Sequence, residues 1–513
     1  MISVVAKQLL TGGLAVLAFI AIAVALQNLH AASDDVRIEP VSIGTIPATV
    51  FRPVGRQLPP VIVIAHGFAG SQQLMQSFAL TFARNGYVAV TFDFAGHGRN
   101  SVPLIGSITQ ETGPTQTLVG ELDLVSRFAT ALGDGRLAVL GHSMASDIVV
   151  RYAEGDPQVS ATIAVSMFSP AVSANSPRNL LIIVGEWEGM LKQEALRAVS
   201  LAIAPDEAKP DVTYGDFELG TARRAAFSPH VEHASVLFSQ ASMREALTWL
   251  DRAFGVARTG PLLIDARGPW ILTLLTAVVV LAFPLSKLLP RLSSPGAGAD
   301  LRWKDIWFPL FLPMLMTPLL LRILPTHFLP VLVGDYLAAH FTLYALLTIA
   351  SLLCIRRASG LRWTPRCSPL LFGMASFLAL LYVFIALAWP IDIYITSFWP
   401  GAERATLVLA LLIGTTLYFL GDEWLTRGSR AARGAYAVSK LAFLISLAVA
   451  IGLDFERLFF LIIVLPEMVL VFLICGLFSV WIYKSTGQPL VAGTLSAVLV
   501  AWAIGVTFPL VAG

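Results

Sequence analysis

The chain has 513 residues, too many for one typical domain, and 56% of them are hydrophobic. Its 35 lysines and arginines nearly balance its 33 aspartates and glutamates, and no basic stretch is interleaved with aromatic residues. These features exclude a nucleic-acid-binding protein and predict that much of the chain lies in lipid.

The first apolar run, at about 12–27, is long enough to cross a bilayer as a helix. The following NLHAAS offers a small-residue cleavage site, so a secretory signal is the alternative to an uncleaved anchor. We favour the anchor, because the run is long for a signal. Under either interpretation, the residues that follow this run are exported across the membrane.

Residues 33–267 predict a domain of mixed α and β structure. Short β-branched runs alternate with amphipathic stretches, the pattern of a mostly parallel sheet covered by helices on both faces. The expected strands are 61–66, 87–93, 136–141, 161–169 and 179–185, and the expected helices are 78–86, 118–132 and 242–255. Ligands meet such sheets at the carboxyl ends of the strands, where this chain carries polar segments.

Residues 268–513 predict a transmembrane bundle of about eight helices. We expect them at 268–289, 306–324, 328–355, 369–391, 404–421, 437–453, 457–482 and 488–511. Lysine and arginine gather in alternate loops, which contain Lys287, Arg291, Arg302 and Lys304; Arg356, Arg357, Arg362 and Arg366; Arg427, Arg430, Arg433 and Lys440; and Lys484. With the 1–32 anchor, this bias predicts a multi-pass plasma-membrane protein with a cytoplasmic N-terminus and an extracytoplasmic C-terminus. The 33–267 domain is then extracytoplasmic, in the periplasm or at the outer face.

The three cysteines all fall in the apolar half, and no His/Cys cluster has zinc-ligand spacing. We therefore expect neither a metal nor a cofactor.

The polar segments at the strand ends occur in an informative order. They read HGFAG, DFAGHGRNS, GHSMA and GEWE, followed late in the domain by VEHAS. In this order, over about residues 45–256, they resemble the α/β-hydrolase superfamily, particularly its dienelactone-hydrolase-like and serine-aminopeptidase-like branch. The apolar half resembles no transporter or channel family that we can name.

The resemblance implies a catalytic triad in the order serine, acid, histidine. Ser143 lies in the position of the nucleophile, although Ala145 replaces the last glycine of the G-x-S-x-G elbow. Glu188 fits the position of the acid, with Glu186 as competitor, and a glutamate there departs from the usual aspartate. His233 fits the position of the base, with His230 as the alternative. The backbone N–H groups of Phe68 and Met144 would form the oxyanion hole.

Three ionisable residues fall inside predicted spans, where they are costly and suggest function. Asp335 and His340 lie in one span and Glu467 lies in another. They predict either a polar site within the membrane or ordinary hydrogen bonds between helices, and we favour the second interpretation.

These observations favour a membrane-embedded serine hydrolase acting on a small-molecule or lipid-linked acyl substrate, an ester, thioester or amide, outside the membrane. Two alternatives remain. The bundle could be a transporter or assembly factor that uses the domain as a binding module, or the triad could transfer the acyl group to an acceptor other than water.

Overall fold

The computed structural model describes residues 2–55, 58–106, 113–203, 205–359 and 367–512. Arg362 and Arg366, which contributed to the charge pattern above, lie outside these ranges. The chain divides into two compact units. One contains Ala23–Leu274 together with Pro390–Trp399 and a short segment from Pro509, and the other contains most of the apolar residues.

The first unit is built on one nine-stranded sheet in the order β1-β2-β4-β3-β5-β6-β7-β9-β8. Its strands are β1 Val36–Ile43, β2 Ile46–Pro53, β3 Val61–Ala65, β4 Val88–Phe92, β5 Leu137–His142, β6 Val159–Val165, β7 Leu180–Gly185, β8 Thr213–Tyr214 and β9 Arg223–Ser228. Neighbours from β4 to β9 run parallel, whereas β1, β2 and β8 pair antiparallel. The six parallel strands therefore present their carboxyl ends at one edge.

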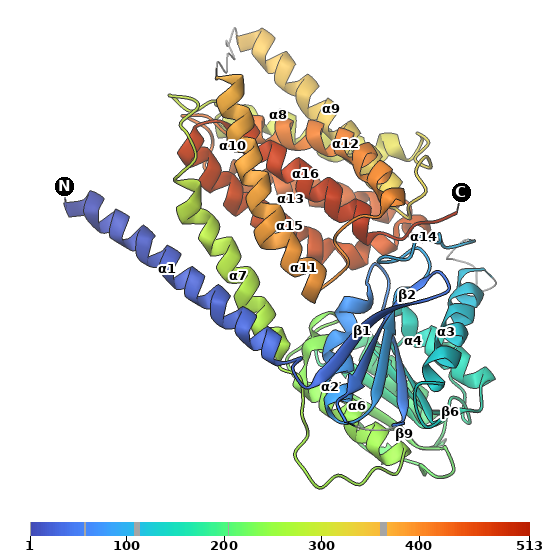
Figure 1. Ribbon diagram of the computed structural model, residues 1–513. Helices are drawn as coiled ribbons and strands as arrows, with labels where there is room; N and C mark the ends of the chain where they lie inside the picture. The colour runs from blue at the N-terminus through green and yellow to red at the C-terminus, as the bar shows by residue number, and fades with distance from the viewer. Residues whose placement is uncertain (1, 56–57, 107–112, 204, 360–366, 513) are drawn as a thin grey trace. The chain divides into compact units, whose positions relative to one another are not determined.

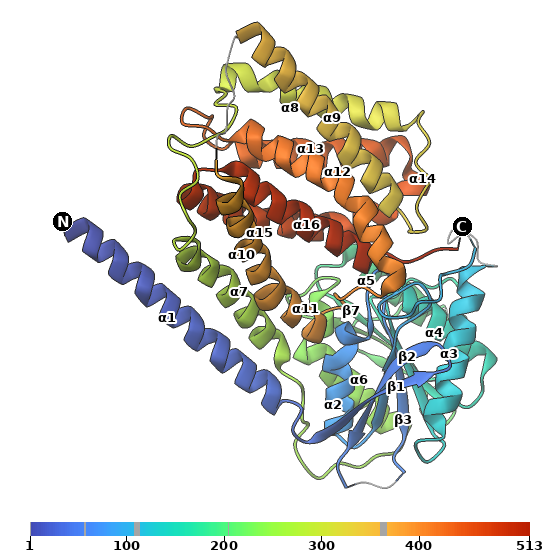
Figure 2. The same ribbon diagram turned by 45° about the horizontal axis from the view of Figure 1, so that its top comes forward.

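Helices cover both faces of this sheet (Figures 1 and 2). They are α2 Gln76–Arg84, α3 Pro114–Thr130, α4 Met144–Gly155, α5 Gly189–Ser200 and α6 Gln240–Ala253. In β3, Ile62 and Ile64 join the core under α2 and α6, while Val61 and Val63 join the core under α3 and α4. Because alternate side chains of a strand point to opposite faces, each buried strand serves two apolar cores.

The fold prediction is confirmed, and strands β3 to β7 and helices α2, α3 and α6 lie where the alternating pattern placed them. The β1–β2 hairpin, β8, β9, α4 and α5 were not among the expected elements. The β1 strand alternates exposed and half-buried residues around polar side chains, so its apolar signal is weak.

The second unit is helical. Its helices are α8 Trp303–Leu321, α9 Gly334–Ser359, α10 Pro369–Tyr382, α12 Ala402–Thr426, α13 Ala435–Leu453, α14 Phe455–Leu458, α15 Phe460–Thr486 and α16 Pro489–Thr507, with the part of α7, Arg267–Ser286, that follows Leu274. The helix α1, Ile2–Ala31, begins in this unit and ends in the other. A π-helical stretch, η3 Val383–Ala388, joins α10 to α11, Trp389–Tyr394. Among the described residues, nine helices are long and apolar enough to span a membrane, which fits a multi-pass membrane protein.

Candidate active site

Ser143 lies in a sharp turn between β5 and α4, at the carboxyl edge of the sheet. Its φ of 54° and ψ of −118° are unusual for a residue with a side chain. A Cβ atom at Gly141 would lie 2.2 Å from the carbonyl oxygen of Ala145, so only glycine fits there. Ala145 itself is fully buried in the core under α3 and α4. The alanine is thus accommodated within the turn.

A chain of two hydrogen bonds links the hydroxyl of Ser143 to a carboxylate. The Oγ atom of Ser143 lies 2.9 Å from Nε2 of His233, and Nδ1 of the same ring lies 2.6 Å from Oε1 of Glu188. His233 precedes the short helix η2, Ser235–Phe238, and Glu188 follows β7. Three distant segments of the chain therefore bring a hydroxyl, an imidazole and a carboxylate into line, the arrangement that activates a serine.

The other oxygen of Glu188 is also engaged. Its Oε2 accepts hydrogen bonds from the amide of Gly185, at 2.7 Å, and from the hydroxyl of Ser166, at 2.8 Å. The side chain is only 6% exposed. These bonds fix the direction in which Oε1 faces His233. Ser166 follows β6 and is not predictable as a site residue from the sequence, because no motif marks an isolated serine.

The competing pair, Glu186 and His230, lies apart from this chain of bonds. Oε2 of Glu186 is 3.3 Å from Nδ1 of His230 and accepts the amide of that residue at 2.8 Å. The side chains are 47% and 85% exposed, respectively. Glu186 and His230 therefore pair with each other on the surface.

The loop after β3, which contains Gly67 and Phe68, runs directly past the serine. A Cβ atom at Gly67 would lie 3.0 Å from Cβ of Ser143, so a side chain there would press on the nucleophile position. Met144 begins α4, and the first N–H groups of a helix have no partner within it. The backbone of this loop and the start of α4 thus flank Ser143.

His142, next to Ser143, contacts His233, the candidate base. Burial, reinforced by the neighbouring His233, lowers the pKa of His142 to about 3, so the ring is neutral near pH 7. Its Nε2 lies 2.9 Å from the carbonyl oxygen of His233 and must donate the proton of that bond. This bond ties His142 to the loop that carries His233.

The buried neutral His142 predicts a loss of stability in acid. Its pKa is about 6.5 in the unfolded chain and lower in the folded one, so protons favour the unfolded state. Its contribution to stability is full above about pH 6.5 and falls as the pH drops toward 3. Burial also lowers the pKa of His66, which acts in the same direction.

We expect the Tm of the detergent-solubilised protein to fall between pH 7.5 and 5, and to fall less in His142→Gln. Differential scanning fluorimetry of both proteins measures this. An equal fall in the two proteins would contradict a neutral buried His142.

Three large apolar side chains are exposed on segments that follow strands of the parallel sheet. Phe168 follows β6, Trp187 follows β7, and Met190 is the second residue of α5; they are 67%, 66% and 84% exposed. All three therefore lie on segments at the same edge of the sheet as Ser143. Trp187 lies in the turn of Glu188 and is not a core residue.

Comparison with known protein families agrees with this architecture. The family model described as serine aminopeptidase, S33, matches residues 57–211, a stretch that contains Ser143 and Glu188 and ends before His233. The matched residues fold into the parallel sheet and helices described above. This unit is an α/β-hydrolase enzyme.

Solved structures similar to the α/β-hydrolase unit include three hydrolases. A CIB-like hydrolase from Thermoplasma acidophilum is 14% identical, with 42% of this chain and 97% of that chain covered and a TM-score of 0.33. A dienelactone hydrolase from Anabaena variabilis is 15% identical, with 42% and 97% covered and a TM-score of 0.30. An epoxide hydrolase from Vigna radiata is 23% identical, with 27% and 41% covered and a TM-score of 0.22. A search of curated protein sequences finds no match.

Two segments from the apolar half of the sequence belong to the α/β-hydrolase unit. Asp392 pairs with Arg99 at 2.8 Å and accepts the amide of Phe398 at 2.8 Å. The amide of Ser397 donates to Oγ of Ser71, three residues after Phe68, at 2.9 Å. The 390–399 segment therefore helps to stabilise the loop beside Ser143 through these bonds.

The second segment, which starts at Pro509, contacts the loop after β4. The amide of Leu510 donates to the carbonyl of Gly96, and Leu510 in turn accepts the amide of Leu104. Both segments adjoin apolar runs, so the sequence alone predicts them within the 268–513 bundle, and no periodic pattern marks such short stretches.

The three ionisable residues of the predicted spans have different surroundings. Asp335 lies 3.4 Å from Nδ1 of His327. His340 is fully buried between aromatic rings, and neither ring nitrogen has a hydrogen-bond partner among the described residues. Glu467 lies on α15 with an exposed side chain. His340 therefore makes no hydrogen bond between helices among the described residues, unlike the interpretation that we favoured from the sequence.

Proposed function

We propose that this protein is a membrane-embedded serine hydrolase that cleaves an ester, thioester or amide through an acyl-enzyme on Ser143. The observation that carries the proposal is the unbroken hydrogen-bond chain from Oγ of Ser143 through His233 to Glu188. The nine apolar spans found among the described residues and the lysine and arginine pattern of the loops favour a plasma-membrane protein with this site on the extracytoplasmic side.

In the proposed first step, Nε2 of His233 takes the hydroxyl proton while Oγ of Ser143 bonds to the substrate carbonyl carbon. The carbonyl oxygen becomes an oxyanion, and the amides of Phe68 and Met144 donate hydrogen bonds to it, each contributing about 2.7 to 4 kcal/mol in comparable enzymes. The leaving group then departs with the proton from His233. Water repeats the sequence on the acyl-enzyme and releases the acid, and Glu188 holds the imidazole in the required tautomer throughout.

We further propose that the acyl group is apolar. The support is a set of exposed apolar side chains on the segments after β6 and β7, namely Phe168, Trp187 and Met190, the last two beside Glu188 in the chain. An exposed apolar patch beside a site indicates an apolar ligand or partner.

This proposal predicts a dependence on acyl length. Trp187→Ser is expected to raise KM for p-nitrophenyl octanoate about five- to tenfold, since burying a chain against the ring contributes roughly 1 to 1.5 kcal/mol, and to leave KM for the acetate nearly unchanged. Leu219→Ser, at an equally exposed position elsewhere on the unit, is the matched control. Equal KM shifts for both esters would contradict an apolar acyl site.

The experiment that tests the function is labelling of membranes with a fluorophosphonate probe, which reacts only with an activated serine. The proposal predicts labelling of the protein, its loss in Ser143→Ala and strong weakening in His233→Ala. A well-folded protein that does not label would favour the interpretation of the unit as a binding module.

A further inference from the structure

The helical unit contains a cavity of about 630 Å³ between the end of α12, the start of α13 and α15. It extends along α15 from Tyr483 to Val469, a length of about 21 Å at 1.5 Å per residue. This cavity lies among residues that the function proposed above does not use.

The two ends of the cavity differ in chemistry. One end carries three cations, Arg427, Arg433 and Lys440, and among the described residues no carboxylate lines the cavity. The other end is apolar and is lined by residues such as Val469 and Leu473. A polar head with an apolar tail fits this division.

Two of the cations are held in fixed positions. Nζ of Lys440 and the guanidinium of Arg427 lie 4.7 Å and 5.3 Å from the centre of the Tyr436 ring, so both pack on one side chain. Lys440 binds Asp422, and Nε of Arg427 lies 3.3 Å from Glu423. Ordered cations can bind an anion without losing much side-chain entropy.

The charges of the three cations and their partners do not cancel. Asp422 and Glu423, which are 2% and 0% exposed, pair with Lys440 and Arg427. Arg433 is exposed and has no ion-pair partner among the described residues. The excess of one positive charge therefore lies on the exposed Arg433.

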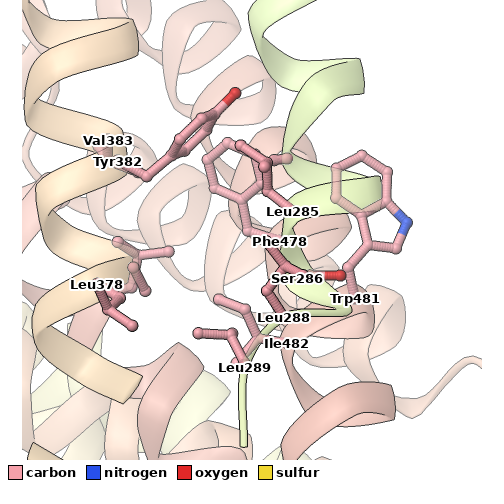
Figure 3. A pocket seen from close by; sticks show the side chains of 13 residues that line it. Leu285, Ser286, Leu288, Leu289, Leu378, Tyr382, Val383, Phe478, Trp481 and Ile482 are labelled. Atoms are coloured by element: carbon pink, nitrogen blue, oxygen red, sulfur yellow. The ribbon is translucent and has the colours of Figure 1, made fainter. Parts of the chain in front are cut away.

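A second cavity in the same unit differs. It measures about 200 Å³ and is lined mostly by apolar side chains, including Leu285, Leu378 and Phe478, with no charged residue among those that line it (Figure 3). No charged side chain among its lining residues could bind a headgroup, so a variant in this cavity serves as the control.

We propose that the larger cavity binds one anionic phospholipid, with its phosphodiester at Arg427, Arg433 and Lys440 and an acyl chain along α13 and α15. A guanidinium binds phosphate oxygens through two parallel hydrogen bonds, and the single negative charge of the headgroup balances the excess positive charge.

The test uses the full chain in detergent, titrated with dioleoyl phosphatidylglycerol or dioleoyl phosphatidylcholine and examined by native mass spectrometry. We expect one phosphatidylglycerol bound at least tenfold more tightly than phosphatidylcholine. Arg433→Gln, which changes an exposed and unpaired side chain, should weaken phosphatidylglycerol binding about tenfold, whereas Arg302→Gln in another loop should not.

A second pair of variants tests the acyl chain. Leu473→Trp fills the apolar end of the cavity and should weaken binding, while Leu378→Trp in the second cavity should not. Equal binding of the two lipids, equal effects of Arg433→Gln and Arg302→Gln, or displacement of the lipid by millimolar inorganic phosphate would each overturn the proposal. Because none of these variants touches the hydrolase unit, labelling of Ser143 serves as an independent measure of folding.

Discussion

Replacement of Ser143 by alanine is expected to lower kcat for ester hydrolysis by about 10⁴- to 10⁶-fold. The change removes the atom that forms the covalent bond and leaves only the surrounding hydrogen-bond donors and binding groups. Hydrolysis of p-nitrophenyl esters by the purified protein measures it. A small residual rate above that of water is consistent with the remaining groups.

Ser173→Ala is the control for this experiment, since Ser173 is exposed on the loop between β6 and β7. It should hydrolyse the ester at the rate of the unchanged protein. Full activity in Ser143→Ala would mean that another residue is the nucleophile.

Replacement of Glu188 by glutamine is expected to lower kcat about 10⁴-fold with little change in Tm. Glutamine keeps the size of the side chain and can still accept from Gly185. It removes the charge that stabilises protonated His233, however, and its amide group can turn the imidazole to the wrong tautomer. Steady-state kinetics with the same ester measure the effect.

Glu186→Gln removes the same charge two residues away, from the side chain that pairs with His230. We expect its kcat to remain within about twofold, because only the exposed pair is lost. A large loss in Glu186→Gln together with an active Glu188→Gln would assign the acid role to Glu186.

The parallel strands β3 to β7 were predictable from the sequence because each is a short, mostly apolar run with a polar segment at its end, whereas β9, RRAAFS, is not. Strand β5 and the turn at Ser143 followed from the run RLAVL and the small residues around the serine. The hairpin β1–β2 was not predictable, since its half-exposed strand has no such run.

Within the candidate site, the sequence supplied the residue types and their order. It could not decide how Glu186 and Glu188 are directed, because that depends on the amide of Gly185 and the hydroxyl of Ser166, which hold Glu188 toward His233. The bond from His142 to the carbonyl of His233 could not be predicted either, because it joins residues 91 positions apart.

The sequence also does not predict where the 390–399 segment lies in the structure. Asp392 lies beside an apolar run, so its pairing with Arg99 depends entirely on tertiary structure. Contacts of this kind join residues that no local pattern connects.

In the proposed mechanism, Ser143 carries the acyl group during turnover. Rapid acid quenching of the protein with p-nitrophenyl octanoate, followed by peptide mass spectrometry, tests it most directly. We expect an octanoyl group on the peptide that contains Ser143, formed in a burst of about one equivalent, and none in Ser143→Ala. An acyl group on another residue, or turnover with no acylated peptide, would contradict it.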